Sequence, residues 1–354
     1  MSAEDNGELS FEEALSRLEA IVRELEAGRI KLDDAVNAYE QAVGLKNFCE
    51  KKLQEAKLKI EKIVVAPDGT TSLDRFFPFP EGDEKRVSEA MHYSLTRGGK
   101  RLRPFLTYET AGLFGIDFEQ SLNVAMALEM LHTYSLIHDD LPAMDDDDLR
   151  RGFPTCHKQF DEATAIIAGD GLLTYAFEIL SRPSTAANPA VRCYLIEMLA
   201  NAAGAFNGMV AGQMLDLIGA AYSVKDNDKE DLIRHIEEMK TGRLLRYAVE
   251  AGAALGGADE EQTKALISYS RRIGIAFQIA DDILDVTGDE RTMGKTLHKD
   301  EKQNKRTFVS LDGLENARRS SAELTAAARE DVAVFGSHAR NLQNLASYII
   351  ERQH

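Results

Sequence analysis

The chain has 354 residues and a formal net charge of −17 at pH 7, with 44% hydrophobic and 29% charged residues. A chain of this size can bury a sizeable core, but it lacks the basic character that nucleic acids and anionic membranes attract. Its three cysteines are far apart, which argues against a disulfide framework or a zinc site. The polar start and the lack of an apolar run near 20 residues predict a cytoplasmic protein.

Residues 10–64 have the pattern of a charged helical hairpin. Ser10 and Glu13 have the spacing of a capping box. An apolar series with steps of three and four residues follows: Phe11, Leu15, Leu18, Val22 and Leu25. Gly28 stands where a helix C-cap is expected, and a second apolar series comes after it. The sequence VAPDGTTS then indicates a turn or linker, which we place at residues 67–71.

Helical patterns dominate from about residue 72 to the end. The stretches SLNVAMALEMLHTYSLIH and ALISYSRRIGIAFQIADDILDV are apolar on most faces, as in helices buried inside a large bundle. Alternating β-branched runs between tight turns are missing, so few or no strands are expected. The sequence predicts an all-α domain over residues 72–354, preceded by the hairpin domain at residues 1–66.

Two acidic clusters follow buried helices of this domain. Asp139 and Asp140 end the first helix, and a run of four aspartates begins at Asp145, where a kink at Pro142 could bring the run back to the helix. In the second cluster, DDILD, the aspartates at 281 and 285 share one helix face. Buried carboxylates are costly unless cations compensate them. Oxygen ligands of this kind suit Mg²⁺ together with substrate phosphates.

The rest of the acidic run and the basic residues support the same interpretation. We expect Asp147 and Asp148 to be solvated or paired with the two arginines that follow. The basic residues form small groups near the acidic clusters: Lys100, Arg101, Arg103, Arg150, Arg151, Lys240, Lys295, Lys299 and Lys305. Each of them alone indicates a surface charge. Next to two acidic clusters in an acidic chain, they favour a pocket for a metal-bound diphosphate.

The motifs GGKRLRP, HDDLPAMDDDDLRRG, GDGLLTYAFEIL, GQMLDL, KTG and FQIADDILDVTGD resemble the bacterial trans-prenyl diphosphate synthases in order and spacing. The resemblance covers residues 72–354 and is nearest to the farnesyl diphosphate synthases. It implies an isoprenoid-synthase-type helical bundle with a central cavity, a homodimer, and head-to-tail joining of an allylic diphosphate to isopentenyl diphosphate.

The resemblance also implies roles for individual residues. Three Mg²⁺ ions would be held on the allylic diphosphate by Asp139, Asp145 and Asp281, assisted by Asp140 and Asp285. The same diphosphate would be neutralised by Arg150, Lys240 and Lys295, and Thr241 and Gln278 would lie beside the ionising carbon. Isopentenyl diphosphate would be bound by Lys100, Arg103, His132 and Arg151, with Gly99 and Lys305 as further substrate-binding residues. For His132 and His138, a purely packed or helix-end role stays open.

Product length is expected to depend on Tyr134 and Ser135. Tyr134, five residues before Asp139, matches the aromatic residue that shortens the cavity in synthases with a C15 product. We therefore expect farnesyl diphosphate, with geranylgeranyl diphosphate as the alternative. The chain departs from the family at His298, where glycine is usual, and in the helix that normally precedes LDRFF, of which only residues 72–77 remain.

Residues 10–66 resemble a different family, the small subunit of bacterial exonuclease VII, through FEEALSRLEAIVRELEAG, LDDAVNAYEQAV and CEKKLQEAKLKIEKIV. That resemblance implies a non-catalytic segment whose partner would be the large nuclease subunit. Any charged hairpin would look broadly similar. A non-catalytic nuclease-subunit fusion stays open as an alternative. A terpene cyclase or a two-metal phosphohydrolase explains fewer of the motifs.

Overall fold

The computed structural model describes residues 80–219, 229–287 and 307–351, together with Phe76 and positions 17, 21, 38 and 41–44. The chain divides into two compact units, Met1–Phe76 and Phe77–His354. The hairpin predicted from the sequence falls in the first unit, where residues 41–44 are helical. Its proposed capping box at Ser10 and Glu13, and Gly28 after it, lie outside the described residues.

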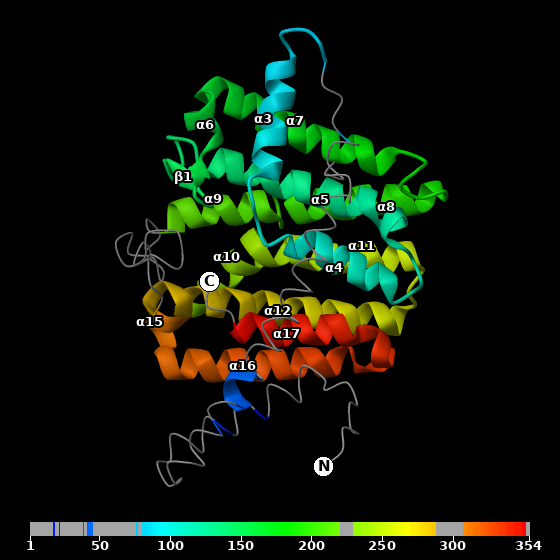
Figure 1. The fold of residues 1–354 in the computed structure, drawn as a ribbon, viewed down its shortest axis with the longest axis vertical. Coiled ribbons are helices and arrows are strands. Elements are labelled where there is room, and N and C mark those ends of the chain that lie inside the picture. The colour runs from blue at the N-terminus through cyan, green and yellow to red at the C-terminus, as the bar shows by residue number, and fades with distance from the viewer. Residues whose placement is uncertain are drawn as a thin grey trace. The chain divides into compact units, whose positions relative to one another are not determined.

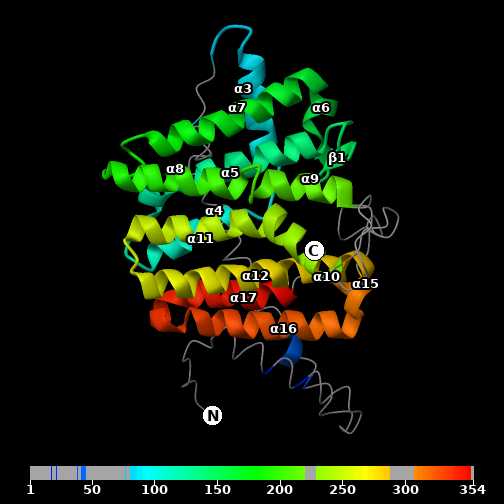
Figure 2. The same cartoon turned by 180° about the vertical axis from the view of Figure 1, so that it is seen from behind.

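The second unit is a stack of helices that run mostly across the view, with α3 standing nearly upright against them (Figures 1 and 2). Its first half contains α3 (Lys85–Thr96), α4 (Leu102–Gly112), α5 (Phe118–Asp139), α6 (Cys156–Gln159), α7 (Glu162–Ser181), α8 (Pro189–Ala203) and α9 (Met209–Gly219). Its second half contains α10 (Lys229–Glu237), a π-helical turn (Glu238–Gly242), α11 (Arg243–Gly256), α12 (Glu260–Thr287), α15 (Phe308–Asp312), α16 (Leu314–Asp331), a 3₁₀ segment (Ala333–Ala339) and α17 (Arg340–Glu351).

Strands contribute little to the described part of the chain. The two strands that it contains are β1 (Leu149–Arg150) and β2 (Phe153–Pro154), which form a two-residue antiparallel hairpin. The prediction of an all-α fold with few or no strands is confirmed.

The central helix α5 shows how the sequence fixes an element. Asp117 caps it by accepting a hydrogen bond from the Gln120 backbone N–H at 2.9 Å, and the Gln120 side chain accepts one from the Asp117 N–H at 3.0 Å. Val124, Leu128 and Leu131 are fully buried along the helix. Burial of each such side chain contributes about 1.5–3 kcal/mol. The prediction that this apolar stretch is a buried helix ending at the first acidic cluster is confirmed.

Two buried tyrosines join the layers of the bundle. The Tyr247 hydroxyl, on α11, donates to the Leu195 carbonyl of α8 at 3.2 Å. The Tyr269 hydroxyl, on α12, donates to the Leu342 carbonyl of α17 at 2.7 Å. Burial raises the pKa of both phenols well above its ordinary value, so both remain protonated donors. The Tyr269 contact holds α12, which carries the second acidic cluster, against α17.

One described helix, α7, is long and apolar enough by length and composition to cross a membrane. The sequence-based expectation that no apolar run approaches that length is therefore wrong for Glu162–Ser181. In the structure, α7 packs against α5 and α3, and 44% of its apolar window is buried inside the bundle. The helix has the composition of a core helix because one side of it is buried there.

Candidate functional site

The loop after α5 returns to the helix that it leaves. Asp139 is the last residue of α5, and the Asp145 backbone N–H donates to the Asp139 carbonyl at 2.9 Å. The turn that contains Pro142 therefore brings the backbones of these two aspartates together. This is the arrangement that the sequence suggested for a kink at that proline.

Asp140 is buried and paired with Arg150 of the β1–β2 hairpin. The Arg150 Nε lies 2.7 and 2.8 Å from the two carboxylate oxygens of Asp140. Burial opposes the charge on Arg150, but the hydrogen bond and charge of Asp140 outweigh it and raise the pKa of the guanidinium. Arg150 also lies 3.9 Å from the Asp147 carboxylate. A buried carboxylate needs such a partner, so in this structure Arg150 neutralises Asp140.

Asp148 was expected to be solvated or paired with an arginine, and the structure shows it solvated. Asp148 is exposed and pairs with Lys158 at 2.8 Å. Arg151 instead donates to the Gly98 carbonyl at 2.6 Å. The reason is the tight hairpin turn, in which Arg151 has a φ of +55° and Gly152 a φ of +81°. That turn directs Arg151 away from the aspartates and toward the GGKRLRP loop.

The double glycine of that loop makes room for Arg151. A Cβ on Gly99 would lie 2.3 Å from the Arg151 guanidinium, and both Gly98 and Gly99 have positive φ. Arg101 follows in the left-handed region, is buried, and donates to the Glu129 carboxylate and the Leu95 carbonyl. The Arg101 side chain is therefore engaged by groups inside the protein. Glu129 was not identified from the sequence, because a single glutamate inside an apolar helix carries no motif.

A cluster of positive groups lies behind this loop. Burial lowers the pKa of Arg103 to about 10, with Glu129 opposing the shift and Arg151 adding to it. Burial also lowers the pKa of His132 well below 6.5, and four nearby arginines, at positions 103, 151, 150 and 101, lower it further. The Arg103 Nε is buried and has no hydrogen-bond partner within the described part of the chain. A concentration of cations with an unused buried donor suits an anionic ligand.

Helix α9 links the two halves of the site. Gln213 donates to the Asp139 carboxylate. One turn later, Asp216 accepts a hydrogen bond from the Lys240 ammonium at 2.7 Å. Lys240 and Thr241 lie in the π-helical turn Glu238–Gly242, a rare geometry that often occurs at functional sites. Gln213 and Asp216 were missed as single residues, although the GQMLDL block pointed to this segment.

The second acidic cluster stands at the end of α12. Asp281 is half-buried and Asp285 is buried. Asp282 accepts a hydrogen bond from the Phe308 backbone N–H at 2.8 Å and another from the Gln278 side chain at 3.1 Å. Asp282 thus fixes the start of α15, and Gln278 is engaged with it. Lys295, Lys299, Lys305 and His298 lie outside the described residues.

The structure collects these groups on one side of the bundle. The β1–β2 hairpin, which carries Arg150, and α15, which contacts Asp282, both lie on the left in Figure 1 and on the right in Figure 2. Lys100 lies with its ammonium 5.5 Å from the centre of the Phe277 ring on α12, and so connects the GGKRLRP loop to the helix of the second cluster. The first acidic cluster is thus connected to Lys240 through α9 and the π-helical turn. The GGKRLRP loop in turn contacts α12, the helix of the second cluster.

The donor set can be tested against a divalent metal. Within the described residues, no group of three or more His, Cys, Asp or Glu side chains is arranged to hold a metal ion by itself. The candidate donors at residues 139, 145, 281 and 285 are all carboxylates. Mg²⁺ takes oxygen ligands and commonly uses one or two carboxylates with substrate phosphates. The residues present therefore fit a metal that binds together with a diphosphate.

Tyr134 and Ser135 lie one turn before the first cluster. Tyr134 is buried, and its ring packs edge-on against His138 at 5.6 Å between centroids. The His138 Nε2 lies 3.1 Å from the Ile166 carbonyl on α7, and a Cβ on Gly169 would lie 2.2 Å from that nitrogen. Ser135 donates to the His132 carbonyl at 2.7 Å. His138 is thus a packing partner of Tyr134, as its alternative role suggested.

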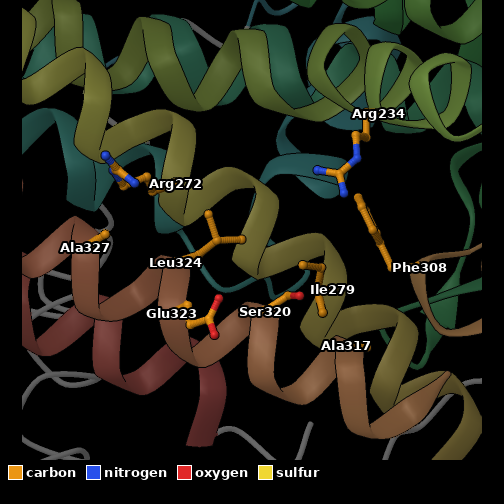
Figure 3. A pocket seen from close by; sticks show the side chains of 9 residues that line it. All are labelled: Arg234, Arg272, Ile279, Phe308, Ala317, Ser320, Glu323, Leu324 and Ala327. Carbon is orange, nitrogen blue, oxygen red and sulfur yellow. The ribbon is translucent and has the colours of Figure 1, made fainter. Parts of the chain in front are cut away.

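A separate cavity is lined by side chains of α10, α12, α15 and α16 (Figure 3). It measures about 410 Å³. The residues that line it are Arg234, Arg272, Ile279, Phe308, Ala317, Ser320, Glu323, Leu324 and Ala327. None of the aspartates or lysines assigned to the candidate site lines this cavity, so its volume says nothing about the reaction.

Comparison with known proteins gives the family of this chain. The polyprenyl synthetase family model matches residues 84–338, and the exonuclease VII small subunit model matches residues 11–62. The chain is 49% identical to the farnesyl diphosphate synthase of Geobacillus stearothermophilus over 253 residues, covering 71% of this chain and 83% of the relative. It is 45% identical to the farnesyl diphosphate synthase of Escherichia coli strain K12 over 289 residues, covering 79% and 94%.

Two further similarities extend the comparison. Geranylgeranyl pyrophosphate synthase 7 of Arabidopsis thaliana is 44% identical, with 76% of this chain and 77% of the relative covered. The crystal structure of an FPP/GFPP synthase from Zymomonas mobilis matches with a TM-score of 0.72 at 40% identity, covering 85% of this chain and 98% of that chain.

The chain belongs to the polyprenyl synthetase family. It is a prenyltransferase, and the family acts on isoprenyl diphosphates with a divalent metal. The resemblance noted from the aspartate-rich and lysine-containing motifs is confirmed, and so is the resemblance of the N-terminal segment to the exonuclease VII small subunit.

Proposed function

We propose that the chain condenses isopentenyl diphosphate with dimethylallyl and then geranyl diphosphate, and releases farnesyl diphosphate. The observation that carries the proposal is the link across α9: Gln213 holds the first acidic cluster, and Asp216 holds Lys240. This link supports one site with carboxylates on two sides and cations between them. Such a site is suited to a leaving diphosphate, whose developing charge needs cations around it.

In the proposed reaction, the C1–O bond of the allylic diphosphate breaks and the diphosphate leaves with the electron pair. The double bond of isopentenyl diphosphate then attacks C1, and a proton from C2 of the new allylic unit passes to the released diphosphate. Lys240 and Lys295 bind the allylic diphosphate, and Thr241 and Gln278 lie beside C1. Arg150, now paired with Asp140, would share its charge with the bound diphosphate.

The second diphosphate is assigned to the cation cluster. Arg103 and Arg151 both lower the pKa of His132, and Arg151 also lowers the pKa of Arg103. Lys100 and Gly99 complete the loop beside them. The unused Nε of Arg103 would donate to a phosphate oxygen. Lys305 is kept as a further substrate-binding residue on the resemblance alone.

Three Mg²⁺ ions are proposed for the allylic side. Asp139 and Asp145 on the first side, and Asp281 and Asp285 on the second, would hold them, with Asp140 assisting. When bound, the metal would neutralise the leaving diphosphate. The carboxylates supply only oxygen ligands, which fits this metal.

The C15 product rests on Tyr134. This buried ring, packed against His138, lies one turn before Asp139 and would block a longer chain. Because relatives of similar identity include geranylgeranyl diphosphate synthases, the C20 product is the competing assignment.

A homodimer is proposed through the exposed apolar residues of α9 and α7. Val210, Met214 and Leu217 are exposed and follow each other at steps of four and three residues, and Ile166 and Ile167 of α7 are also exposed. An apolar helical face of this kind favours burial against a second copy. Sedimentation of the Met214→Asp variant tests this: a dimer in the wild type and a monomer in the variant are expected.

The proposed domains are the hairpin at residues 1–66, the linker at 67–71 and the synthase at 72–354. The match of residues 11–62 to the exonuclease VII small subunit supports the large nuclease subunit as a possible partner of the hairpin. No direct binding of nucleic acid and no membrane association are proposed, in keeping with the net charge of −17. A cytoplasmic location is proposed as well.

The deciding experiment is incubation of the purified chain with Mg²⁺, isopentenyl diphosphate and either dimethylallyl or geranyl diphosphate, followed by sizing of the prenyl product. A C15 product is expected. A C20 product would keep the reaction and refute the role of Tyr134. Absence of any product from a folded chain would refute the synthase proposal and leave the nuclease-subunit role as the next to test.

A further inference from the structure

Thr155, a residue with no assigned role, holds the aspartate-rich loop of residues 145–148. Thr155 lies directly before α6 and is 2% exposed. Its hydroxyl lies 2.8 Å from the Asp147 carbonyl, and its backbone N–H donates to the Asp148 carbonyl at 3.0 Å. One residue thus holds two consecutive carbonyls of the loop, and neither contact involves an aspartate side chain.

His157 is the second member of this contact, and its tautomer follows from the geometry. The Thr155 Oγ1 lies 3.2 Å from the His157 Nδ1. A carbonyl can only accept, and the Asp148 carbonyl lies farther from the hydroxyl, at 3.4 Å, so the single hydroxyl proton of Thr155 goes to Asp147. The Thr155 oxygen must therefore accept a hydrogen bond from the Nδ1–H of His157. The other ring nitrogen, Nε2, is buried and has no hydrogen-bond partner within the described part of the chain.

Thr155 adds to the other contacts that fix the middle of the loop, among them the hydrogen bond from the Asp146 N–H to the Leu141 carbonyl at 3.2 Å. Asp146 has a φ of +49°, a conformation that L residues rarely adopt. On one side of it, the Asp145 N–H is bound to the Asp139 carbonyl. On the other side, the Asp147 carboxylate lies 3.9 Å from Arg150, which in turn holds Asp140. A shift of the Asp147 carbonyl would therefore move both the first acidic cluster and its arginine.

We propose that Thr155 and His157 are positioning residues for prenyl transfer: through the chain His157 Nδ1–H to Thr155 Oγ1–H to the Asp147 carbonyl, they hold the loop of residues 145–148 in the conformation that receives the allylic diphosphate and its metal. This inference rests on the proposed function. Thr155 and His157 lie outside the set of metal-binding and substrate-binding residues. They act through the loop and touch no substrate.

Four variants separate this role from general stabilisation. Thr155→Val keeps the shape of the side chain and removes the hydroxyl, whereas Thr155→Ser keeps the hydroxyl. His157→Asn places an amide nitrogen near the position of Nδ1, whereas His157→Gln places it near Nε2. Thr185→Val is the matched control, because Thr185 is also buried and donates to a carbonyl, that of Ile179, at 2.6 Å, and has no assigned role in the site.

The full-length chain is assayed for the KM of geranyl diphosphate, the KM of isopentenyl diphosphate and the Mg²⁺ concentration for half-maximal activity. Calorimetry with a non-ionising geranyl thiolodiphosphate adds a binding readout without turnover. For Thr155→Val and His157→Gln, we expect about tenfold weaker allylic binding and a higher Mg²⁺ requirement, from the loss of one buried hydrogen bond. Thr155→Ser and His157→Asn should stay within about threefold of the wild type, and the KM of isopentenyl diphosphate should change less than about twofold.

The inference is overturned if Gln replaces His157 as well as Asn does, if both KM values rise together, or if the Thr185→Val control gives the same pattern. If Thr155→Val does not fold, the Asn and Gln variants of His157 decide the question by themselves. A wild-type chain that binds no allylic diphosphate would overturn the proposed function as well. A wild-type chain that is active, with His157→Gln unchanged, would overturn this inference alone.

Discussion

His132 is a single residue whose surroundings set its charge. It is partly buried on α5 and faces arginines from the GGKRLRP loop and from the β1–β2 hairpin, which together with burial hold its pKa well below 6.5. At neutral pH it is therefore uncharged, and it can add a hydrogen-bonding group to the cluster without adding charge. A bound diphosphate would offset the arginine charges and make protonation of His132 easier.

This pKa predicts a pH-dependent loss of stability. The unfolded chain binds a proton at His132 near pH 6.5 and the folded chain only at lower pH, so the free energy of unfolding falls as pH drops below about 6.5. The slope from this group is at most about 1.4 kcal/mol per pH unit. Urea unfolding of His132→Gln between pH 7.5 and 5.5 should show a shallower decline than the wild type. The exposed His338→Gln serves as control, and an equal change in both variants would contradict the prediction.

Tyr134 is expected to limit the length of the product. Truncation to alanine in Tyr134→Ala removes the ring that packs against His138 and leaves space beside the first acidic cluster. The product should lengthen from C15 to C20 or beyond, while the Mg²⁺ requirement stays the same, because the aspartates are unchanged. Product sizing by chromatography is the measurement. An unchanged C15 product from a folded variant would show that another residue limits the chain.

At the scale of elements, the approach of α9 to the π-helical turn decides where Lys240 points. Gly212 makes this approach possible: a Cβ there would lie 2.5 Å from the Lys240 backbone nitrogen and 2.9 Å from its Cα. Backbone atoms cannot rotate away as a flexible side chain can. The contact keeps Asp216 within 2.7 Å of the Lys240 ammonium.

Gly212→Ala should therefore push the two elements apart. We expect a loss of about 1–3 kcal/mol in the free energy of unfolding from overpacking, and weaker binding of the allylic diphosphate because Lys240 moves. Chemical denaturation and the KM of geranyl diphosphate are the measurements. Gly112→Ala is the matched control, because a Cβ there meets nothing within 4 Å, and it should leave the stability unchanged or raise it by less than about 1 kcal/mol. Equal effects in the two variants would refute the explanation.

At the scale of the whole molecule, the two compact units and the two family matches divide the chain at similar places. Along the chain the first unit ends at Phe76, and the polyprenyl synthetase match begins at residue 84, after the exonuclease-like match ends at residue 62. The described residues assigned to metal, substrate and product length all belong to the second unit. The first unit therefore contributes none of the groups assigned to the chemistry.

A chain that begins at Ser72 should accordingly retain prenyl transfer. We expect kcat and both KM values within about threefold of the full-length chain, since no assigned residue is removed. The measurement is steady-state kinetics on the two proteins side by side, with sedimentation to follow the oligomeric state. A folded but inactive short chain would show that the N-terminal unit supports the synthase, in place of the helix that LDRFF normally follows.

The helices and the two acidic clusters could be predicted from the sequence because both depend on local patterns. The runs that end at Asp139 and Asp285 are long and apolar on most faces, as buried helices are, and a carboxylate after a buried helix is visible without coordinates. The resemblance then implied metal-binding and substrate-binding roles for residues such as Asp281 and Lys240. Those assignments remain predictions until the variants are assayed.

What only the tertiary structure decided is which group meets which. Asp148 pairs with Lys158, Arg151 with Gly98, and Asp282 with Phe308. A hairpin turn with positive φ sets the direction of Arg151, and the packing of α12 against α15 brings Asp282 to Phe308. A periodic sequence pattern encodes neither of these. Gln213 and Thr155 belong to the same class: each is an ordinary polar residue in the sequence, and its role follows from the group that packing places within hydrogen-bonding distance.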